Sequence, residues 1–477
     1  VDEAFDDEEL DYRDCMKKLI STRKKLCPVK LEHSRVLDDT VIEHLRRDLG
    51  LFKDQVFHTE TPLELSFLFQ IQNALREKKE LFYEKRIPQN SPEFVDNEPV
   101  LDQICEHDKL LFYPYESMKP FIRLLKEAGN DTRVVSIKMT LYRVARNSQI
   151  VEALIDAAEN GKEVVVLVEL RARFDEENNI AWAKKLEKAG CHVIYGLVGL
   201  KTHSKIALVV RREEDGIKRY VHLGTGNYND ATAKLYTDMG LLTCSDPIGE
   251  DATAVFNMLS GYSEPKKWNK LAVAPIWLKD KFLMLINREA ENARQGKKGR
   301  IIAKMNSLCD PKVMHALYDA SAAGVKIDLI VRGICCIRVG VPGLSENISV
   351  RSIVGNYLEH SRIFYFYNDG FEDIYMGSAD WMPRNLDKRV EITFPVEDPE
   401  LKEKIKNILK IQLADTLKAH IMQPDGSYEK QDLRGKVRLD SQMYFVEEAR
   451  KSQKEEDEVE DKRVFIPVEA EESEEDI

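Results

Sequence analysis

Two short motifs of this sequence combine a His, a cation and a Gly-Ser/Thr turn. In each motif a His-Ser-basic triplet is followed by Gly-[Ser/Thr]-x-[Asn/Asp]. The first set is His203, Lys205, Gly224, Thr225 and Asn227; the second is His360, Arg362, Gly377, Ser378 and Asp380. A lone His on a strand is usually structural, so the duplication of the whole set is the informative feature.

These residue types fit phosphate chemistry. A His and a cation two positions apart on a strand point to the same face, where both can address one anion. The Gly-Ser/Thr turn offers backbone N–H groups and a hydroxyl, which suit phosphate oxygens. If the two sets face each other, one imidazole can attack a phosphorus while the other protonates the leaving oxygen.

The elements that carry the two sets recur in the same order. Buried strands alternate with amphipathic helices from about residue 100, and this favours an α/β fold. Four segments of the second half match segments of the first half in residue pattern: 300–308 with 133–141, 311–334 with 148–171, 348–366 with 191–209, and 373–381 with 219–229. We infer an internal duplication.

The duplication makes KTHSK at 201–205 the counterpart of LEHSR at 358–362. The other LEHSR string, at 31–35, has no Gly-rich turn after it. We therefore expect His33 to be a surface or edge-strand residue.

Composition narrows the class of protein. The 477 residues are 43% hydrophobic and 32% charged, with a formal net charge of −12, as in a globular protein that does not coat nucleic acid. The sequence contains neither a run of about 18 apolar residues nor a CxxC pair. A reducing cytoplasm fits the scattered cysteines.

The chain divides into four predicted regions. We expect a mostly helical part of an α+β domain at 1–92, two duplicated α/β domains with mixed sheets at 93–268 and 269–435, and an acidic charged tail at 436–477, which we expect to be disordered or loosely attached from residue 447. One helix is predicted over residues 62–86 within the first region. The start at VDEAFDDEEL lacks a Met, so we expect a part of a longer protein.

The motif pattern resembles the phospholipase D superfamily, whose motif is His-x-Lys-x4-Asp with a downstream Gly-Ser-x-Asn. The acidic position of that motif is Val210 in the first half and Tyr367 in the second, and Arg362 replaces the second Lys. These departures weaken the alternative prediction of a phospholipase D-type phosphodiesterase or nuclease.

Longer strings resemble one family, the histidine-phosphorylated polyphosphate kinases. They include SIKMTLYRVARNSQIVEAL, VELRARFDEENNI, GLKTHSKIALVVRR, HLGTGNYN, RGICCIRVGVPGLSENI and SADWMPRNLDKRVE. The resemblance is close from about 93 to 430 and implies two phospholipase D-like catalytic domains after the end of a middle domain. It also implies that the family's N-terminal domain lies outside this sequence.

The resemblance implies a reaction and a set of substrates. The family transfers the terminal phosphate of ATP reversibly to inorganic polyphosphate through a phosphohistidine, with Mg²⁺. A dimer or tetramer, and a cytoplasmic location with peripheral association at the inner membrane face, are further implications. A non-catalytic polyanion-binding protein is a third hypothesis, against which the retention of both His residues and the Arg set argues.

Site residues follow from the matching strings. The resemblance implies that His203 is the phosphorylated nucleophile and that His360 is the second His, near the nucleotide phosphates. It implies adenine stacking for Tyr236 and a phosphate path with Mg²⁺ beside Arg143 and Arg173. Arg332 and Arg389 complete the cationic set with Lys205 and Arg362, and Asn227 joins the phosphate contacts. Dense positive charge is what transfer to a polyanion requires.

Several of these residues have structural alternatives. An Arg cannot ligate Mg²⁺, so we infer Asp238 and Glu391 as the better oxygen ligands. Arg143 and Arg173 could instead form salt bridges with Glu152, Glu169 or Asp175. Tyr236 could be a core aromatic, and we expect His222 to be packed or to support another residue.

Overall fold

The computed structural model describes residues 12–461 except 24, 173–174, 198 and 262. The chain separates into two compact units, residues 1–86 and 87–477. None of the helices in the described ranges is long and apolar enough to cross a membrane.

The first unit combines short helices with one small sheet. Its elements are α1 (Tyr12–Arg23), β1 (Leu31–His33), α2 (Asp39–Asp48), η1 (Lys53–Gln55), β2 (Val56–His58), α3 (Phe67–Ala74) and η2 (Lys79–Leu81). Asp38 caps α2 by accepting a hydrogen bond from the Thr40 N–H at 2.8 Å. The helix predicted over 62–86 is shorter than expected, because α3 ends at Ala74. His33 is partly exposed on β1, which pairs in parallel with β2, so the prediction of an edge-strand His is confirmed.

The first half of the second unit is built on a mixed sheet. Its strands run in the order β15-β10-β9-β8-β4-β5-β6, and β3 also pairs with β10. The elements are α4 (Val100–Glu106), β3 (Lys109–Tyr113), α5 (Lys119–Asn130), β4 (Val134–Leu141), α6 (Gln149–Glu159), β5 (Glu163–Val168), α7 (Glu176–Lys188), β6 (His192–Ile194), β7 (Lys201–Thr202), β8 (Ile206–Glu213), β9 (Gly216–Gly224), η3 (Thr232–Lys234), β10 (Tyr236–Thr243) and α8 (Asp246–Leu259).

The second half repeats this plan. Its sheet runs β11-β19-β17-β16-β12-β13-β14-β20-β21. The elements are β11 (Ala272–Val273), α9 (Leu278–Arg294), β12 (Arg300–Met305), α10 (Pro311–Ala322), β13 (Lys326–Val331), β14 (Ile348–Ile353), β15 (Leu358–Glu359), β16 (Ile363–Phe366), η4 (Asn368–Gly370), β17 (Asp373–Gly377), α11 (Pro383–Asp387), β18 (Arg389–Val390), β19 (Ile392–Val396), α12 (Pro399–Leu413), β20 (Ala419–Met422), β21 (Tyr428–Lys430) and α13 (Ser441–Asp461). The predicted class, two duplicated α/β domains with mixed sheets, is confirmed.

Strand register corrects one of the string matches. Met139 lies opposite Ala207, and Ala303 lies opposite Phe364. Ala207 and Phe364 are equivalent positions after the two His motifs, so Met139 corresponds to Ala303. The match of 300–308 with 133–141 paired Met139 with Asn306 instead and is wrong in register. Similar apolar strings align at several offsets, and only the backbone pairing selects one.

The two halves exchange short strands next to the His motifs. β7, directly before His203, pairs in parallel with β18 of the second half. β15, directly before His360, pairs in parallel with the start of β10 in the first half. Each His therefore follows a strand that is hydrogen-bonded to the opposite half.

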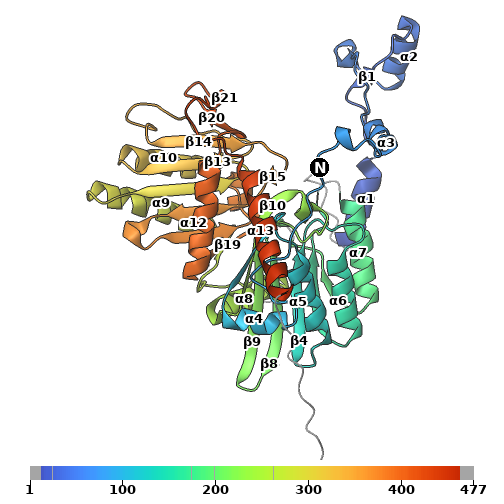
Figure 1. Cartoon of the computed structure of the whole chain (residues 1–477). Coiled ribbons are helices and arrows are strands. Elements are labelled where there is room, and N and C mark those ends of the chain that lie inside the picture. The colour runs from blue at the N-terminus through green and yellow to red at the C-terminus, as the bar shows by residue number, and fades with distance from the viewer. Residues whose placement is uncertain (1–11, 24, 173–174, 198, 262, 462–477) are drawn as a thin grey trace, which may run out of the picture. The chain divides into compact units, whose positions relative to one another are not determined.

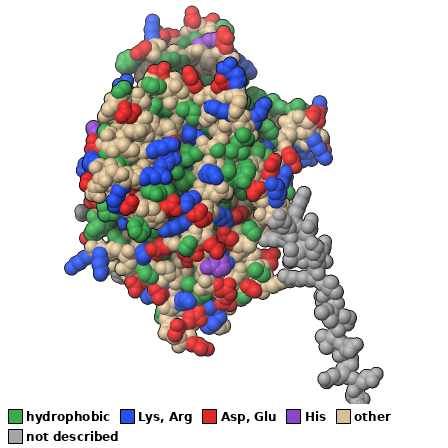
Figure 2. Space-filling view, turned by 60° about the vertical axis from the view of Figure 1, so that its left-hand side comes forward, with side chains coloured by type: hydrophobic (Ala, Val, Ile, Leu, Met, Phe, Trp, Pro, Cys, Tyr) green, Lys and Arg blue, Asp and Glu red, His purple; other side chains and the backbone are tan. Residues whose placement is uncertain are grey.

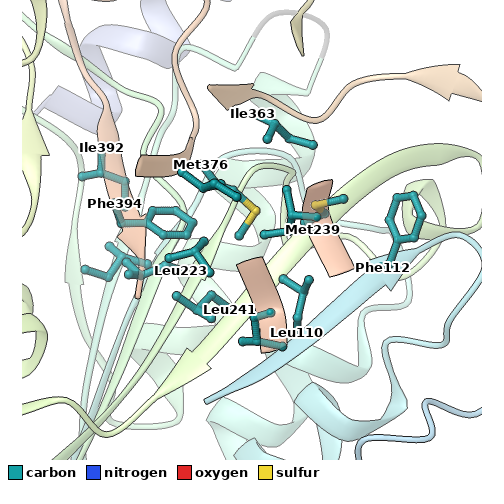
Figure 3. Packing of buried hydrophobic residues seen from close by; sticks show 14 of the residues in the cluster. Leu110, Phe112, Leu223, Met239, Leu241, Ile363, Met376, Ile392 and Phe394 are labelled. Carbon is teal, nitrogen blue, oxygen red and sulfur yellow. The ribbon is translucent and has the colours of Figure 1, made fainter. Parts of the chain in front are cut away.

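One hydrophobic cluster spans both halves. Figure 3 shows Leu223 and Met239 of the first half close to Met376 and Phe394 of the second. Helices α8 and α12 contribute to the same cluster, while α9 and α10 pack on the other face of the second sheet. Burying this shared apolar surface stabilises the contact between the halves and holds the exchanged strands in register.

The region predicted as an acidic charged tail from residue 436 contains an attached helix. Residues 441–461 form α13, and Phe445 and Val446 near its start are buried in the shared cluster. The Phe445 ring packs against Phe112 and Tyr115 at centroid distances of 5.2 Å and 5.3 Å. The apolar residues before the acidic run explain this attachment. Residues 462–477 lie outside the described ranges.

Candidate functional site

His203 is buried at the junction of the two halves. Its Nδ1 lies 2.9 Å from Oε2 of Glu391, which directly precedes β19. The backbone N–H of His203 donates to the Val390 carbonyl at 2.9 Å, so the strand exchange itself places the ring. Burial and the nearby charges of Lys205 and Arg389 lower the pKa of His203 well below its ordinary value. The imidazole is consequently neutral at pH 7.

Glu391 acts as an acceptor for several donors at once. The Ser378 hydroxyl donates to Oε2 at 2.5 Å, and the Asn385 amide donates to Oε1 at 2.6 Å. Burial raises the pKa of Glu391, while Lys205, Arg389 and the Ser378 hydroxyl oppose that rise. Both carboxylate oxygens act as acceptors, and Oε2 accepts a hydrogen bond from the Nδ1–H of His203. The Nε2 lone pair of His203 is left as the reactive position.

His360 repeats this arrangement with the halves interchanged. Its Nδ1 lies 2.7 Å from Oδ2 of Asp238 on β10, and the Thr225 hydroxyl donates to Asp238 Oδ1 at 2.7 Å. Burial would raise the pKa of Asp238, but His360, Arg362 and Thr225 keep it below the ordinary value. Burial lowers the pKa of His360 and outweighs the opposing effect of Asp238.

Each His is thus oriented by a carboxylate of the opposite half. Tyr236-Thr237-Asp238 and Arg389-Val390-Glu391 occupy equivalent places, because each triplet pairs with the strand before the opposite His. The two His–carboxylate pairs are a pseudo-symmetric consequence of the strand exchange. Neither pair can form within one half alone.

Two buried cations accompany the His residues. The Lys205 ammonium donates to the His203 carbonyl and lies 5.2 Å from the centre of the Tyr142 ring. Burial lowers the pKa of Lys205 well below its ordinary value, although Glu391 opposes the shift. Arg362 donates to the carbonyls of His360 at 2.9 Å and Thr225 at 3.2 Å. These cations place positive charge beside both rings.

Asp380 anchors Arg362. Its carboxylate accepts from Arg362 Nε at 3.2 Å and Nη2 at 3.1 Å. Burial opposes its ionisation, yet Arg362 and the Asn306 N–H hold the pKa of Asp380 at about 2. Asn306 also donates to the His360 carbonyl at 3.2 Å and accepts from Arg332 at 2.7 Å. Arg332 is therefore linked to the second His through Asn306.

The hydroxyl groups of the two Gly-Ser/Thr turns form hydrogen bonds with the two carboxylates. The hydroxyls of Thr225 and Ser378 donate to Asp238 and Glu391, so the prediction that they face phosphate oxygens is wrong. Gly226 is required here, because a Cβ at this position would overlap the Asp238 carboxylate. Asn227 stands in the same turn, and its Oδ1 is buried without a hydrogen-bond partner within the described residues.

The remaining predicted residues surround the His pairs. The Tyr236 ring lies 5.3 Å from the His360 ring and is partly exposed, so it is not a core aromatic. Arg389 lies 3.8 Å from Glu391 and is also partly exposed. Arg143 forms an ion pair with Asp175 at 3.2 Å, one of the structural alternatives for this residue. Arg173 lies outside the described residues. His222 is packed as expected, with Nδ1 2.9 Å from the Tyr228 hydroxyl.

Sequence reasoning missed Tyr142, Asn306 and Asn385. The Tyr142 ring meets His203 edge-on at 4.8 Å. Tyr142 stands next to Arg143 inside a quoted string, so a signal was present. Asn385 also lies inside a quoted string, five residues after Asp380, whereas Asn306 lies far from His360 along the chain and only the fold brings it to the site.

The described residues contain no group of three or more His, Cys, Asp or Glu side chains arranged to hold a metal ion. Asp238 and Glu391 are occupied by His360 and His203, and they lie on opposite sides of the pseudo-symmetric site. Their inferred role as oxygen ligands of Mg²⁺ stays a prediction. The geometry gives both carboxylates an orienting role.

Comparison with known proteins identifies the family of this chain. Three parts of the sequence match domains described as the polyphosphate kinase middle domain (residues 1–71), C-terminal domain 1 (99–265) and C-terminal domain 2 (271–442). The chain belongs to the polyphosphate kinase family. The matched segments contain both His–carboxylate pairs. Their boundaries at 265 and 271 enclose the predicted boundary between the duplicated halves.

Individual members of the family are similar over most of this chain. Polyphosphate kinase of Lactiplantibacillus plantarum is 47% identical over 449 residues, which are 94% of this chain and 62% of the relative. That of Halalkalibacterium halodurans is 52% identical over 415 residues, 87% of this chain and 59% of the relative. The crystal structure of polyphosphate kinase from Porphyromonas gingivalis matches with a TM-score of 0.82 and 34% identity, over 90% of this chain and 66% of that one. The chain thus spans about three fifths of its curated relatives.

Proposed function

We propose that this chain carries out the reversible transfer of the terminal phosphate of ATP to inorganic polyphosphate through a phosphohistidine at His203. The observation that carries the proposal is the buried, neutral His203 whose Nδ1 is held by Glu391. A neutral imidazole with one nitrogen donating to a carboxylate has its other nitrogen free as a nucleophile. Family membership supports the same activity.

The transfer has two steps. In the first, His203 Nε2 forms a bond to the terminal phosphorus of ATP while the P–O bond to ADP breaks. In the second, the terminal oxygen of a polyphosphate chain attacks the same phosphorus, the N–P bond breaks, and neutral His203 is restored. Lys205, Arg362 and Arg389 surround the ring and offset the charge on the transferring group.

His360 serves the nucleotide side of the reaction. Its Nδ1 is held by Asp238, and its Nε2 lies 3.3 Å from Arg362 Nη1. We assign it contact with the nucleotide phosphates and proton transfer to or from the bridging oxygen. Tyr236 beside it stacks on the adenine, and Arg332, linked through Asn306, contacts the phosphates. Asn227 joins the phosphate-binding set, and its side-chain amide NH₂ is the group that would donate to phosphate oxygens.

Magnesium enters as the metal of the substrate MgATP. Because an Arg cannot ligate a cation, Arg143 and Arg173 would bind the phosphates that carry the metal. Asp238 and Glu391, one beside each His, are the candidate carboxylate contacts of the metal. Mg²⁺ supplies charge neutralisation on the phosphates when bound.

The biological setting is part of the same proposal. ATP, ADP and inorganic polyphosphate are the partners, and the protein is a homo-oligomer, dimeric or tetrameric. Its location is cytoplasmic, with peripheral association at the inner membrane face. Free thiols suit a reducing compartment.

Incubation with [γ-³²P]ATP and Mg²⁺, followed by mass spectrometry, tests the proposal. We expect an acid-labile, base-stable label on His203, absent in His203→Ala. The matched control is His33→Ala, which changes the other LEHSR string and should retain the label. A label that survives undiminished in His203→Ala contradicts the proposal. Hydrolysis of bis-p-nitrophenyl phosphate without ATP would point to a phosphodiesterase, and polyphosphate binding without any phosphohistidine would point to a binding protein.

A further inference from the structure

The second catalytic half contains a cavity that the His pairs do not use. It has a volume of about 600 Å³ and lies between the start of the sheet strands β12 and β13 and helix α12. Its lining combines apolar and cationic side chains, among them Ile302, Tyr365, Leu413, Lys298, Lys326 and Lys410. This volume falls in the range of small-molecule sites.

The interior surface of the cavity is apolar and aromatic. Ile302 on β12 lies opposite Tyr365 on β16, so both side chains share one face of the sheet. Leu409 and Leu413 approach from α12. These four residues belong to the shared hydrophobic cluster or pack against it, so their positions are set by the core. A flat apolar group can be desolvated between Ile302 and Leu413.

The opening of the cavity is cationic. Lys326 and Lys410 are exposed, and no ion pair with another residue of the described ranges accompanies either one. Lys298 lies over the Tyr367 ring at 4.7 Å from its centre. Two other cations are already neutralised: Arg300 pairs with Asp328, and Lys406 pairs with Glu372 at 2.5 Å and Glu403 at 2.6 Å. Three lysines are therefore available to an anion.

The side of the second half that is turned forward in Figure 2 carries Lys and Arg side chains around hydrophobic ones. Cations around a hydrophobic recess bind a ligand that has an anionic part and an apolar part. A purely inorganic anion would leave the apolar lining without a partner.

The cavity lies away from the catalytic residues. Arg300 begins β12 and Met305 ends it, directly before Asn306 of the His360 site. Lys326 likewise begins β13, and Arg332 directly follows its end. At about 3.3 Å per residue the cavity and the catalytic site are roughly 17 Å apart at opposite ends of the same strands. A ligand in the cavity is thus separate from the reacting phosphates.

We propose that this cavity is a second nucleotide site, which takes a phosphorylated aromatic compound with its ring against Ile302 and Leu413, the partly exposed apolar residues of the lining. Its phosphates meet Lys298, Lys326 and Lys410 at the opening. None of the residues that line the cavity takes part in the reaction proposed for His203, so the second site is independent of that reaction.

Equilibrium dialysis with radiolabelled ADP tests the site through its stoichiometry. We expect two ADP molecules per wild-type chain. Lys326→Glu/Lys410→Glu reverses the charge at the opening, and we expect the second dissociation constant to rise at least tenfold, leaving one ADP bound. Leu413→Trp narrows the cavity without a charge change and should give the same loss. The matched control is Lys312→Glu/Lys430→Glu, which makes the same charge change at exposed lysines outside the cavity and should bind two.

Three outcomes would overturn the proposal. The first is a single ADP per wild-type chain, and the second is retention of both ADP molecules in the two cavity variants. The third is displacement of the second ADP by tripolyphosphate as readily as by unlabelled ADP, which would show that the ring is not recognised. Tyr236→Ala separates the two sites: loss of the first ADP in that variant concerns only the catalytic proposal.

Discussion

Glu391→Gln removes the negative charge that faces His203 and leaves the shape of the side chain almost unchanged. The new amide oxygen can take the place of Oε2, where it accepts from Ser378 and from His203 Nδ1. The amide nitrogen then faces Asn385. The Oδ1 of Asn385 is buried without a hydrogen-bond partner in the described part of the chain, so rotating that amide supplies the missing acceptor.

The expected size of the effect follows from the loss of charge alone. A hydrogen bond to a charged acceptor is worth about 1.5–3 kcal/mol and a neutral one about 1 kcal/mol. The difference of about 0.5–2 kcal/mol slows phosphoryl transfer to His203 by roughly two- to thirtyfold. Glu391→Ala is different, because it leaves buried donors on His203 and Asn385 without an acceptor. We expect it to destabilise the fold by about 2–6 kcal/mol.

Rapid-quench measurement of phosphohistidine formation from [γ-³²P]ATP gives the rate, and urea unfolding gives the stability. Glu397→Gln is the matched control, since it makes the same chemical change at a partly exposed carboxylate paired with Lys270 at 2.6 Å. We expect the control to behave as wild type in both measurements. The reasoning is refuted if Glu391→Gln forms phosphohistidine at the wild-type rate, or if it unfolds as easily as Glu391→Ala.

Three further predictions concern other parts of the site. Tyr236→Ala should weaken ATP binding at the catalytic site about tenfold by calorimetry, and unchanged affinity would argue against stacking. Burial lowers the pKa of His222 to about 3. The unfolded state therefore takes up the proton first as pH falls below about 6.5, and the folded state loses stability. From pH 7 to pH 5 the free energy of unfolding of the wild type should fall by about 2 kcal/mol more than that of His222→Gln. The prediction is contradicted if the two proteins differ in unfolding free energy by the same amount at both pH values. Gln442→Leu removes hydrogen bonds to Glu359 and Tyr357. We expect it to lower the free energy of unfolding by about 1–3 kcal/mol, measured as a lower urea midpoint. A midpoint equal to that of the wild type would show that α13 does not support the His360 strand.

Much of the fold could be predicted from local patterns. Apolar strands alternating with amphipathic helices predicted the α/β class, because burial on both faces of a sheet demands that pattern. The helix predicted over 62–86 was too long, since helical periodicity alone does not say where the chain leaves the helix. The register of 300–308 was also wrong, because short apolar strings fit several offsets equally well. Phe445 and Val446 lie in the region predicted as an acidic charged tail, yet they are buried, because the acidic run begins only after them.

The sequence predicted which residues form the site but not which hydrogen bonds join them. His203, His360, Lys205 and Arg362 meet where two copies of the same motif were expected to face each other. The roles of Thr225 and Ser378 were misjudged, because a hydroxyl beside a Gly turn suits a carboxylate as well as a phosphate. Tyr236 and Arg332 do lie near His360, and the family resemblance rather than any local pattern pointed to them.

The sequence by itself determined the duplication, the paired His motifs and the family, because these are patterns within short stretches of chain. Only the tertiary structure decided that Glu391 holds His203 and that Asp238 holds His360, across 188 and 122 residues. That exchange depends on β7 pairing with β18 and β15 with β10. The pairing arises where the halves bury a common hydrophobic cluster. A hydrogen bond needs its two atoms within about 3 Å of each other, and separation along the chain carries no information about that distance.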